Sequence, residues 1–478
     1  MGLEDGTGTT DHNQDSGATI AASETTPYIA WRRNSPLVQV ILMGLVCFCC
    51  PGMFRALSGM GGGGQVDPTA ANNANTALYA ALAVFCVVGG GLFNIAGPRL
   101  MLPAGCITYA LYALSFLYYN HTRDQTVIVV AGGILGVGGG MLWSVQGAIL
   151  TSYPPPERKG AYISMFWVIF SSGGVVGGLI PFSLNFHRGA DSVNDATYIV
   201  FIVFMVAGTI LSIAILPKNQ LLRDDGSRCT STAHSNPATE TVELLKLFTN
   251  WKMLLLAPAA CASNFFYTYQ FNNVNAAQFT TRTRGLNNVS YWGAQMVGSA
   301  AIGHVFDLDL GLKKPNNKRR HQGFLGIGTV FLVSTAIWAG GFANQLHYSF
   351  ADMPQPKLDF MDSGPKFAGP FVLYFGYGLL DSIFQSMIYW VIGALADDSK
   401  VLSRYVGFYK GVQSAGASLA WWLDARRVPM MAQLAVNWAL STVSFPLLVV
   451  LVALAVKDEQ KGEQKEERKG QVHGGESS

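Results

Sequence analysis

One acidic side chain lies well inside a long apolar stretch of this sequence. Asp381 occupies the middle of the run 368–395, and Gln385 follows four residues later. A carboxylate in an apolar environment is costly, and it avoids much of that cost by taking up a proton. Asp381 is therefore a candidate proton carrier. The alternative is a structural role, in a hydrogen bond or in an ion pair with Lys410.

Other polar and aromatic side chains gather in two further apolar runs, 127–149 and 251–274. Amide groups supply hydrogen-bond donors and acceptors for a polar organic molecule, and aromatic rings can stack on it. The alternatives are hydrogen bonding between helices and ordinary packing. Together, the candidate residues of a substrate cavity are Trp143, Gln146, Tyr267, Gln270, Asn273, Asp381 and Gln385.

One arginine lies near the end of the first apolar run, 37–57. The guanidinium of Arg55 could attract an anionic solute. A long basic side chain near the end of a span can equally extend to the membrane–water interface. We favour the interfacial position for Arg55.

No motif for enzyme chemistry is present. The sequence contains no HExxH, no GxSxG and no phosphate-binding loop,. The string GGILGVGGG at 132–140 resembles a dinucleotide loop, but no strand precedes it. Its glycines, spaced by four, instead favour close helix packing, as do Gly173/Gly177 and Gly174/Gly178. We expect no enzyme activity, no cofactor and no metal site.

Composition indicates what positions these residues. Half of the 478 residues are hydrophobic and only 13% are charged, against about 25% charged in soluble proteins. Stretches near the roughly 20 apolar residues that cross a bilayer recur twelve times. The expected spans are 37–57, 75–95, 99–119, 127–149, 160–183, 196–216, 251–274, 286–306, 323–343, 368–395, 403–423 and 431–456. The net charge of +3 is too small to indicate nucleic-acid binding.

These spans predict an all-α, multi-pass integral membrane protein, with twelve transmembrane helices in two pseudo-symmetric six-helix bundles. We expect the bundles at 35–216 and 251–456, joined by a cytosolic linker at 217–250. The tails 1–34 and 457–478 are too polar to bury themselves,. Both are predicted to be disordered and cytosolic.

Basic residues support this orientation. With both tails in the cytosol, 22 of the 32 Lys and Arg residues lie on the cytosolic side and nine lie outside, as the positive-inside rule requires. The pair Arg426 and Arg427 is an exception. The sequon at Asn120 falls in a predicted external loop, so we expect glycosylation there.

Two turns at matching places in the halves resemble each other. Gly90, Asn94, Gly97 and Arg99 lie in the first, and Gly303, Asp307, Gly311 and Lys313 lie in the second. This repeat suggests an internal duplication, as in many transporters. The candidate gating residues are Asn94, Gly97, Arg99, Gly303 and Asp307. We expect the 303–322 segment to pack near the 94–99 turn.

The duplicated turn resembles the signature of the major facilitator superfamily, although Asn94 replaces its acid and Pro98 a basic residue. The segments CPGMFRALSGMGGGGQ (50–65), NANTALYA (73–80) and FNIAGPRLML (93–102) resemble the Unc-93-like branch, common in fungi. The resemblance covers about 36–456. It implies that helices 1, 4, 7 and 10 line a central cavity.

Two functions remain open. The superfamily resemblance implies a secondary transporter of a small organic solute, working by alternating access, with a proton as candidate coupling ion. The alternative is a non-transporting regulator or trafficking partner of another membrane protein, because animal relatives of this branch are a potassium-channel subunit and an escort for immune receptors. The host membrane is the plasma membrane or an endomembrane.

Overall fold

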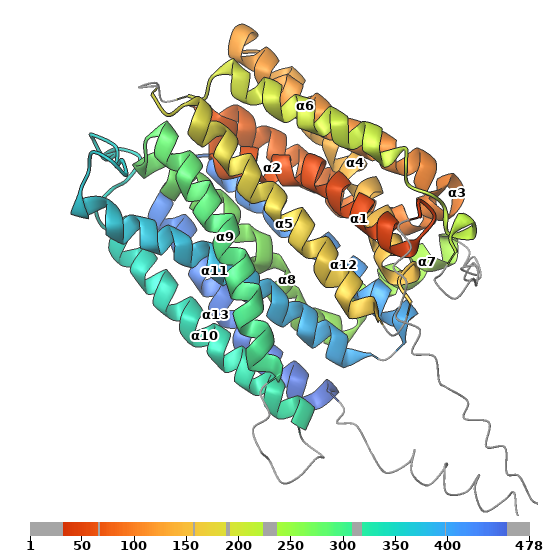
Figure 1. Ribbon diagram of the computed structural model, residues 1–478. Helices are drawn as coiled ribbons and strands as arrows, with labels where there is room; N and C mark the ends of the chain where they lie inside the picture. Colours follow the sequence, from red (N-terminus) through yellow and green to blue (C-terminus); the bar gives the residue numbers. More distant parts are fainter. Residues whose placement is uncertain are drawn as a thin grey trace, which may run out of the picture.

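The chain is almost entirely helical in a computed structural model that describes residues 32–456, except 66, 156–157, 188–191, 223–236, 308–317 and 397 (Figure 1). The N-terminal helices are α1 (Pro36–Cys47), η1 (Phe48–Gly52), α2 (Met53–Gly59), η2 (Gly62–Gly64), α3 (Thr69–Thr122), α4 (Gln125–Ser152), α5 (Lys159–Leu184) and α6 (Asp195–Ser212). The connecting helices are η4 (Lys218–Gln220), α7 (Pro237–Lys246) and η5 (Leu247–Thr249). The C-terminal helices are α8 (Trp251–Thr268), η6 (Tyr269–Ala276), α9 (Thr281–Asp307), α10 (Lys318–Gln345), α11 (Pro365–Leu395), α12 (Ser399–Ala425) and α13 (Met430–Ala455).

Eight helical segments of the described chain are long and apolar enough to cross a membrane. They are Pro36–Gly59, Ala96–Thr122, Gln125–Leu150, Ala161–Leu184, Asp195–Ser212, Arg319–Gln345, Pro365–Leu395 and Met430–Ala455. The other predicted spans, 75–95, 251–274, 286–306 and 403–423, are helical as well. The last three carry many of the polar side chains described below, which lowers their hydropathy.

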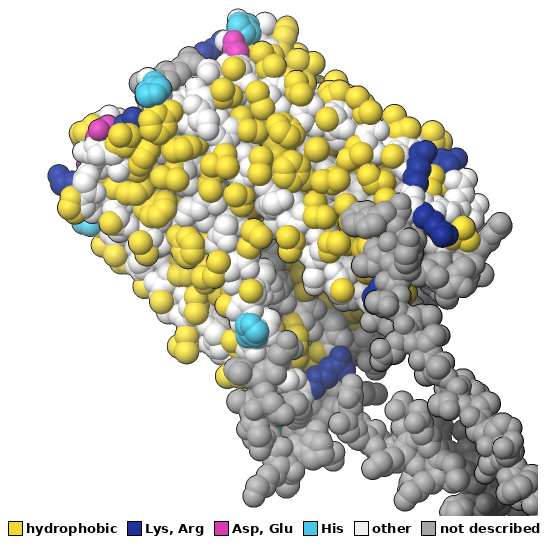
Figure 2. Space-filling view, viewed as in Figure 1, with side chains coloured by type: hydrophobic (Ala, Val, Ile, Leu, Met, Phe, Trp, Pro, Cys, Tyr) yellow, Lys and Arg dark blue, Asp and Glu magenta, His cyan; other side chains and the backbone are white. Residues whose placement is uncertain are grey.

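The outer surface fits a bilayer. Hydrophobic side chains spread over the broad side of the bundle, and charged side chains gather at its two ends (Figure 2). Leu332 and Ile210, both in predicted spans, are 68% and 64% exposed. Large apolar side chains facing outward are stable against lipid and would be costly in water. The protein is therefore an integral, multi-pass membrane protein.

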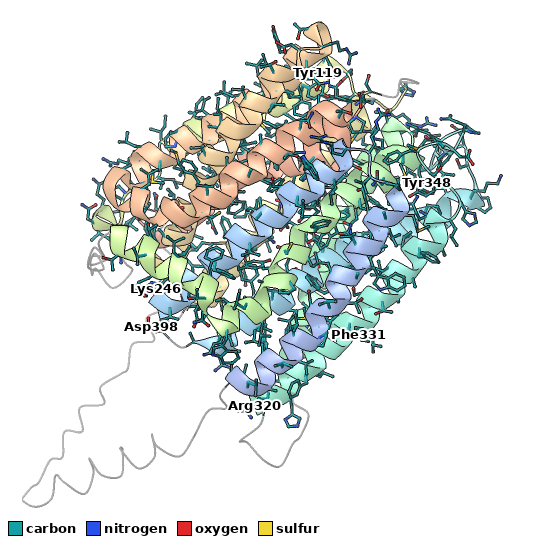
Figure 3. The ribbon with its side chains drawn as sticks, turned by 180° about the vertical axis from the view of Figure 1, so that it is seen from behind. Tyr119, Lys246, Arg320, Phe331, Tyr348 and Asp398 are labelled. Carbon is teal, nitrogen blue, oxygen red and sulfur yellow. The ribbon has the colours of Figure 1, made fainter. Side chains whose placement is uncertain are left out.

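We call one end of the helix bundle the tail face and the other end the loop face. The tail face holds the start of α1 and the end of α13, with Lys246, Arg320 and Asp398 (Figure 3). The loop face holds the segments 60–65 and 346–364, with Tyr119 and Tyr348 (Figure 3). The predicted tails lie mostly in 1–31 and 457–478, outside the described residues.

A kink at the tail face divides α3. Gly97 has a φ of 67° and a ψ of 171°, outside the helical region, and Pro98 cannot donate a backbone hydrogen bond. The predicted break at Gly97-Pro98 is thus confirmed. Beyond it, Arg99 donates to Gln220 Oε1 at 2.8 Å, which ties the kink to the start of the connecting segment.

Glycines allow the helices to approach closely. α3 packs along α4 and along α12, and α5 packs along α9. A Cβ on Gly132 or Gly136 of α4 would lie 2.2 Å from a backbone oxygen of α3. On α5, a Cβ on Gly178 would lie 2.9 Å from the backbone of Val289 in α9. The predicted role of these glycines in helix packing is confirmed.

Candidate functional site

Asp381 lies at the centre of a buried polar cluster. Its side chain is fully buried on α11. Oδ2 accepts hydrogen bonds from the Tyr267 hydroxyl at 2.9 Å and the Tyr291 hydroxyl at 3.2 Å, and also from Gln295 Nε2. Gln385 Nε2 donates to Oδ1 at 2.6 Å. Four donors from three helices, α8, α9 and α11, therefore surround one carboxyl group.

A chain of amides connects this cluster to Lys410, and the ion pair considered as the alternative role of Asp381 is absent from the described residues. Among the described residues no ion pair joins Lys410 to Asp381. Lys410 Nζ donates to Gln413 Oε1 at 2.8 Å, Gln413 Nε2 lies 3.2 Å from Gln385 Oε1, and Gln385 donates to Asp381. Two amides thus separate the ammonium from the carboxylate.

A second carboxylate joins the N-terminal to the C-terminal helices. Asp424 of α12 is 4% exposed. Its Oδ2 accepts from Asn72 of α3 and from Asn272 of η6, both at 2.7 Å, and its Oδ1 accepts from Gln433 of α13 at 2.9 Å. Asn273 lies here too, donating to Gln433 Oε1 at 2.9 Å. We call Asn72, Asn272, Asp424 and Gln433 the loop-face clamp.

Backbone carbonyls at the end of α2 extend this closure. Arg284 of α9, 1% exposed, donates to the carbonyl oxygens of Met60 at 2.6 Å and Gly61 at 2.8 Å. Asn288, also of α9, donates to Ala56 O at 2.6 Å. Gly62 N donates to Asn272 Oδ1 at 2.7 Å. The loop 60–65 is therefore bound to η6 and α9 across the seam between the two sets of helices.

A third contact at this face comes from the loop 346–364. Arg282 donates to both carboxylate oxygens of Asp359 at 2.7 Å, and Thr280 and Thr283 donate to Oδ2. Partial burial opposes ionisation, but the hydrogen bonds from Arg282, Thr280 and neighbouring groups hold the pKa of Asp359 well below its usual range,. Phe360 lies 6.1 Å from the ring of Phe186, just after α5.

Arg55 does not extend to the membrane interface, so that prediction is wrong. Its guanidinium carbon lies 4.2 Å from the ring centre of Phe170 on α5 and 5.2 Å from that of Trp292 on α9. Trp143 packs edge-on against Phe170 with ring centres 5.6 Å apart. Cation–π attraction of the guanidinium to these rings on α5 and α9 holds the Arg55 side chain inside the bundle.

The predicted cavity residues fall into separate groups. Tyr267, Gln385 and Asp381 form one cluster, and Gln270 joins it by accepting from Tyr291 at 2.8 Å. Trp143 lies with Arg55, and Asn273 lies beside the loop-face clamp. Gln146, 9% exposed, contacts none of these groups among the described residues. The structure therefore brings together four of the seven residues in one place.

The gating residues are only partly described. Gly97 and Arg99 lie at the tail-face kink. Gly303 lies on α9 with open space around its Cα. The side chains of Asn94 and Asp307 lie outside the described residues, as does the segment 308–317. The packing of the 303–322 segment near the 94–99 turn stays a prediction.

Asn120 lies in the last turn of helix α3 rather than in a free loop. Its Nδ2 donates to Asp195 at 2.8 Å and its Oδ1 accepts from Gln65 at 2.7 Å. Both ends of the amide are thus engaged with α6 and the loop after α2. Glycosylation at Asn120 stays a prediction.

Comparison with known proteins identifies the family. The model of the family described as ion channel regulatory protein UNC-93 matches residues 62–283. UNC93-like protein 1 of Arabidopsis thaliana is 63% identical over 434 residues, 91% of this chain and 93% of the relative. The chain belongs to the UNC-93 family. An UNC93-like protein of Schizosaccharomyces pombe is 41% identical over 85% of this chain and 80% of its own.

Solved structures place this UNC-93 chain in a transporter fold. A D-xylose-proton symporter matches with a TM-score of 0.58 at 10% identity, over 88% of this chain and 97% of its own. The nucleoside transporter NupG matches with a TM-score of 0.59 at 10% identity, over 87% and 100%. At this identity the likeness concerns the fold alone. The predicted resemblance to an Unc-93-like protein of the major facilitator superfamily is confirmed.

Sequence reasoning about this UNC-93 protein missed several residues of the site. Tyr291 and Gln295 lie on α9, which the resemblance did not assign to the cavity lining. Asn72 and Asp424 lie at the ends of predicted spans, where polar residues are ordinary. The available signal was periodicity, since Asn288, Tyr291 and Gln295 are spaced three and four apart and share one helix face,.

Proposed function

We propose that this protein is a secondary transporter of a small organic solute, with twelve membrane spans in two six-helix bundles. In this proposal the bundles are 35–216 and 251–456, and they rock about a site at Asp381 and Arg55. One observation carries it. A buried carboxylate with exchangeable donors lies beneath a polar closure that joins the two sets of helices at one face.

The hydrogen bonds across the seam support a closed loop face. The clamp, the Arg284 bonds to carbonyls and the Asp359 loop all lie at that end. The connecting helix α7 also joins the two sets, because it packs against α3 and α12. Breaking a few polar contacts at one face is what alternating access requires.

The surroundings of Asp381 support proton coupling. Its partners are hydroxyl and amide groups, which can reorient when the carboxylate takes up a proton, because a hydroxyl both donates and accepts. In the part of the chain that the structure describes, no ion pair joins Asp381 to a cation that would hold it in the ionised form. A carboxyl group in this setting can change protonation as the cavity changes its access to water.

Flux measurements test this proposal. Purified protein in liposomes, loaded with a pH-sensitive dye, would be exposed to fractions of a small-metabolite extract. We expect one or more fractions to drive proton movement, and Asp381→Asn to reduce it by about ten-fold or more, the scale of a lost proton-transfer group. Asp362→Asn, on the 77% exposed surface carboxylate, is the control. Equal fluxes in both variants would refute proton coupling through Asp381.

A second function is favoured by the family description. The family model names ion channel regulation, so we propose, as the alternative, that the chain regulates another membrane protein. Co-purification from native membranes would recover a stoichiometric channel subunit in this case. The absence of flux for every fraction, together with such a partner, would favour regulation over transport.

A further inference from the structure

The helix bundle carries two cations that no carboxylate contacts directly in the described part of the chain. Among the described residues, no ion pair includes Arg55 or Lys410. Lys410 donates a hydrogen bond to Gln413 and lies over the rings of Tyr409 and Tyr389 at 5.1 and 5.6 Å. Arg55 has its two ring contacts and no hydrogen bond in the described part of the chain. Its five N–H donors are therefore available.

These donors are not sealed in the core. Arg55 and Lys410 are both partly exposed, although both lie within helices that cross the predicted bilayer. Arg55 lies one turn below the carbonyls of Met60 and Gly61, which Arg284 closes off at the loop face. Lys410 lies on the tail-face half of α12. A ligand would therefore approach from the tail face, pass Lys410 and reach Arg55.

The charges in this region sum to a positive value. Asp381 is a buried carboxylate of this region, and the amide chain links it to Lys410. Two cations against one acid leave an excess of one positive charge. An unneutralised charge in a low-dielectric interior is costly, and binding an anion would remove that cost.

The aromatic rings around Arg55 indicate what the uncharged part of the ligand is like. Phe170 and Trp292 flank the guanidinium, and Trp143 packs against Phe170. Trp167 also packs on Phe170, with ring centres 5.6 Å apart. Rings around an arginine suit a planar apolar body that stacks while its acid group pairs with the guanidinium in a bidentate fashion.

We propose that Arg55 is the anion-binding residue of the central site and that the solute is an organic acid with a planar, apolar body, drawn in by Lys410. That the ligand is a transported solute rests on the proposed function, but its binding can be measured without flux. It names a substrate class that neither the family description nor the fold specifies.

The test uses three matched probes and purified full-length protein in detergent. The probes are 2-naphthoate, its neutral amide 2-naphthamide, and the cation 2-naphthylmethylamine. Quenching of tryptophan fluorescence would report binding, since Trp292 and Trp143 lie at the site. We expect 2-naphthoate to bind at least about ten-fold more tightly than the other two, the scale of a charge-assisted hydrogen-bonded pair.

Variants assign the effect to the residues. Arg55→Gln should abolish the preference for the acid, and Arg55→Lys should retain part of it. Arg426→Gln is the matched control, because Arg426 also lies over an indole, Trp422, at 5.3 Å, but on the exterior. Thermal unfolding of each variant shows whether it is folded. If Arg55→Gln does not fold, the comparison of Arg55→Lys with Arg426→Gln decides.

The outcomes separate this inference from transport itself. Preferential binding of 2-naphthoate that depends on Arg55 supports the site even if no solute is carried. Equal binding of all three probes, tighter binding of the amine, or no binding of the acid overturns it, and leaves transport of another solute class open to the flux assay.

Discussion

Asp381 and Lys410 show how a buried carboxylate and a partly exposed ammonium can share a helix bundle without touching. Each is surrounded by neutral hydrogen-bonding groups, and Gln413 and Gln385 connect them. When one partner of a direct, buried ion pair is removed, the other charge is left unpaired, and this strongly destabilises the fold. In an amide-linked arrangement each charge keeps most of its own partners.

This arrangement makes a prediction about paired variants. Asp381→Asn should fold, and Lys410→Met should not rescue it, because no direct ion pair is broken. The unfolding temperatures of the two single variants and the double variant form a cycle, in which we expect the coupling to be within about 0.5 kcal/mol of zero, as for groups without a shared contact. Strong rescue by Lys410→Met would show that the two charges pair directly.

Asp359 gives a prediction about pH. Its folded pKa lies below the unfolded value of about 3.9, so ionised Asp359 stabilises the folded state above pH 4, and this stabilisation is lost as the pH falls further,. The unfolding temperature of the purified protein should therefore drop more steeply between pH 5 and pH 3 than that of Asp359→Asn. Parallel curves for the two proteins would contradict this account of the Arg282–Asp359 contact.

A site residue can be predicted from the sequence when its type is unusual for its position in a membrane span. Asp381 and Gln385 are costly in a span, so their position alone identifies them, and the structure brings them together. Arg55 lies near a span end, where interfacial and interior positions look alike in sequence. Only the rings of Phe170 and Trp292, distant in sequence, decide between them. Asp424 and Asn72 were missed because they also lie at span ends, where polar residues are ordinary.

At the scale of elements, two helices carry a π-helical segment in the region of the site. η1 contains Pro51, which cannot donate the usual backbone bond,, and it precedes Arg55 by one turn. η6 contains Gln270 and Asn272, which serve the Asp381 cluster and the loop-face clamp. π-Helical turns widen a helix and redirect the following side chains, and they are frequent at functional sites. No sequence pattern predicted η6.

Glycine spacing, by contrast, was predictable, and it makes a testable claim about α4. Gly136→Ala would place a methyl 2.2 Å from Leu78 O, whereas Gly133, three residues away, faces open space. We expect Gly136→Ala to lower stability by about 1–3 kcal/mol, as overpacking does, and Gly133→Ala to leave it nearly unchanged. Thermal unfolding in detergent measures both. Equal effects would mean that α3 and α4 are not in close contact.

At the scale of the whole molecule, the charge distribution gives the orientation. The tail face holds the larger share of basic residues, so we predict that it faces the cytosol. A protease added to intact cells should leave a tag after Ser478 uncut, and should cut it once the membrane is permeabilised. Cutting in intact cells would reverse the orientation, and with it the side from which a ligand reaches Lys410.

The central claim is that the two sets of helices rock about the buried site, with the loop face closed in this structure. The most direct test is pulsed spin–spin distance measurement across the seam. One labelled pair, Gln125→Cys with Lys366→Cys, reports the loop face, and a second, Arg158→Cys with Asp398→Cys, reports the tail face. The comparison is between the native clamp and Asp424→Ala, with Asp352→Ala, an exposed carboxylate of the loop 346–364, as control.

Rocking predicts changes of opposite sign. In Asp424→Ala a longer loop-face distance should gain population while the tail-face distance shortens, and Asp352→Ala should resemble the native protein. Unchanged distances at both faces in Asp424→Ala, or lengthening at both faces together, would contradict alternating access and leave this UNC-93 protein as a static membrane component.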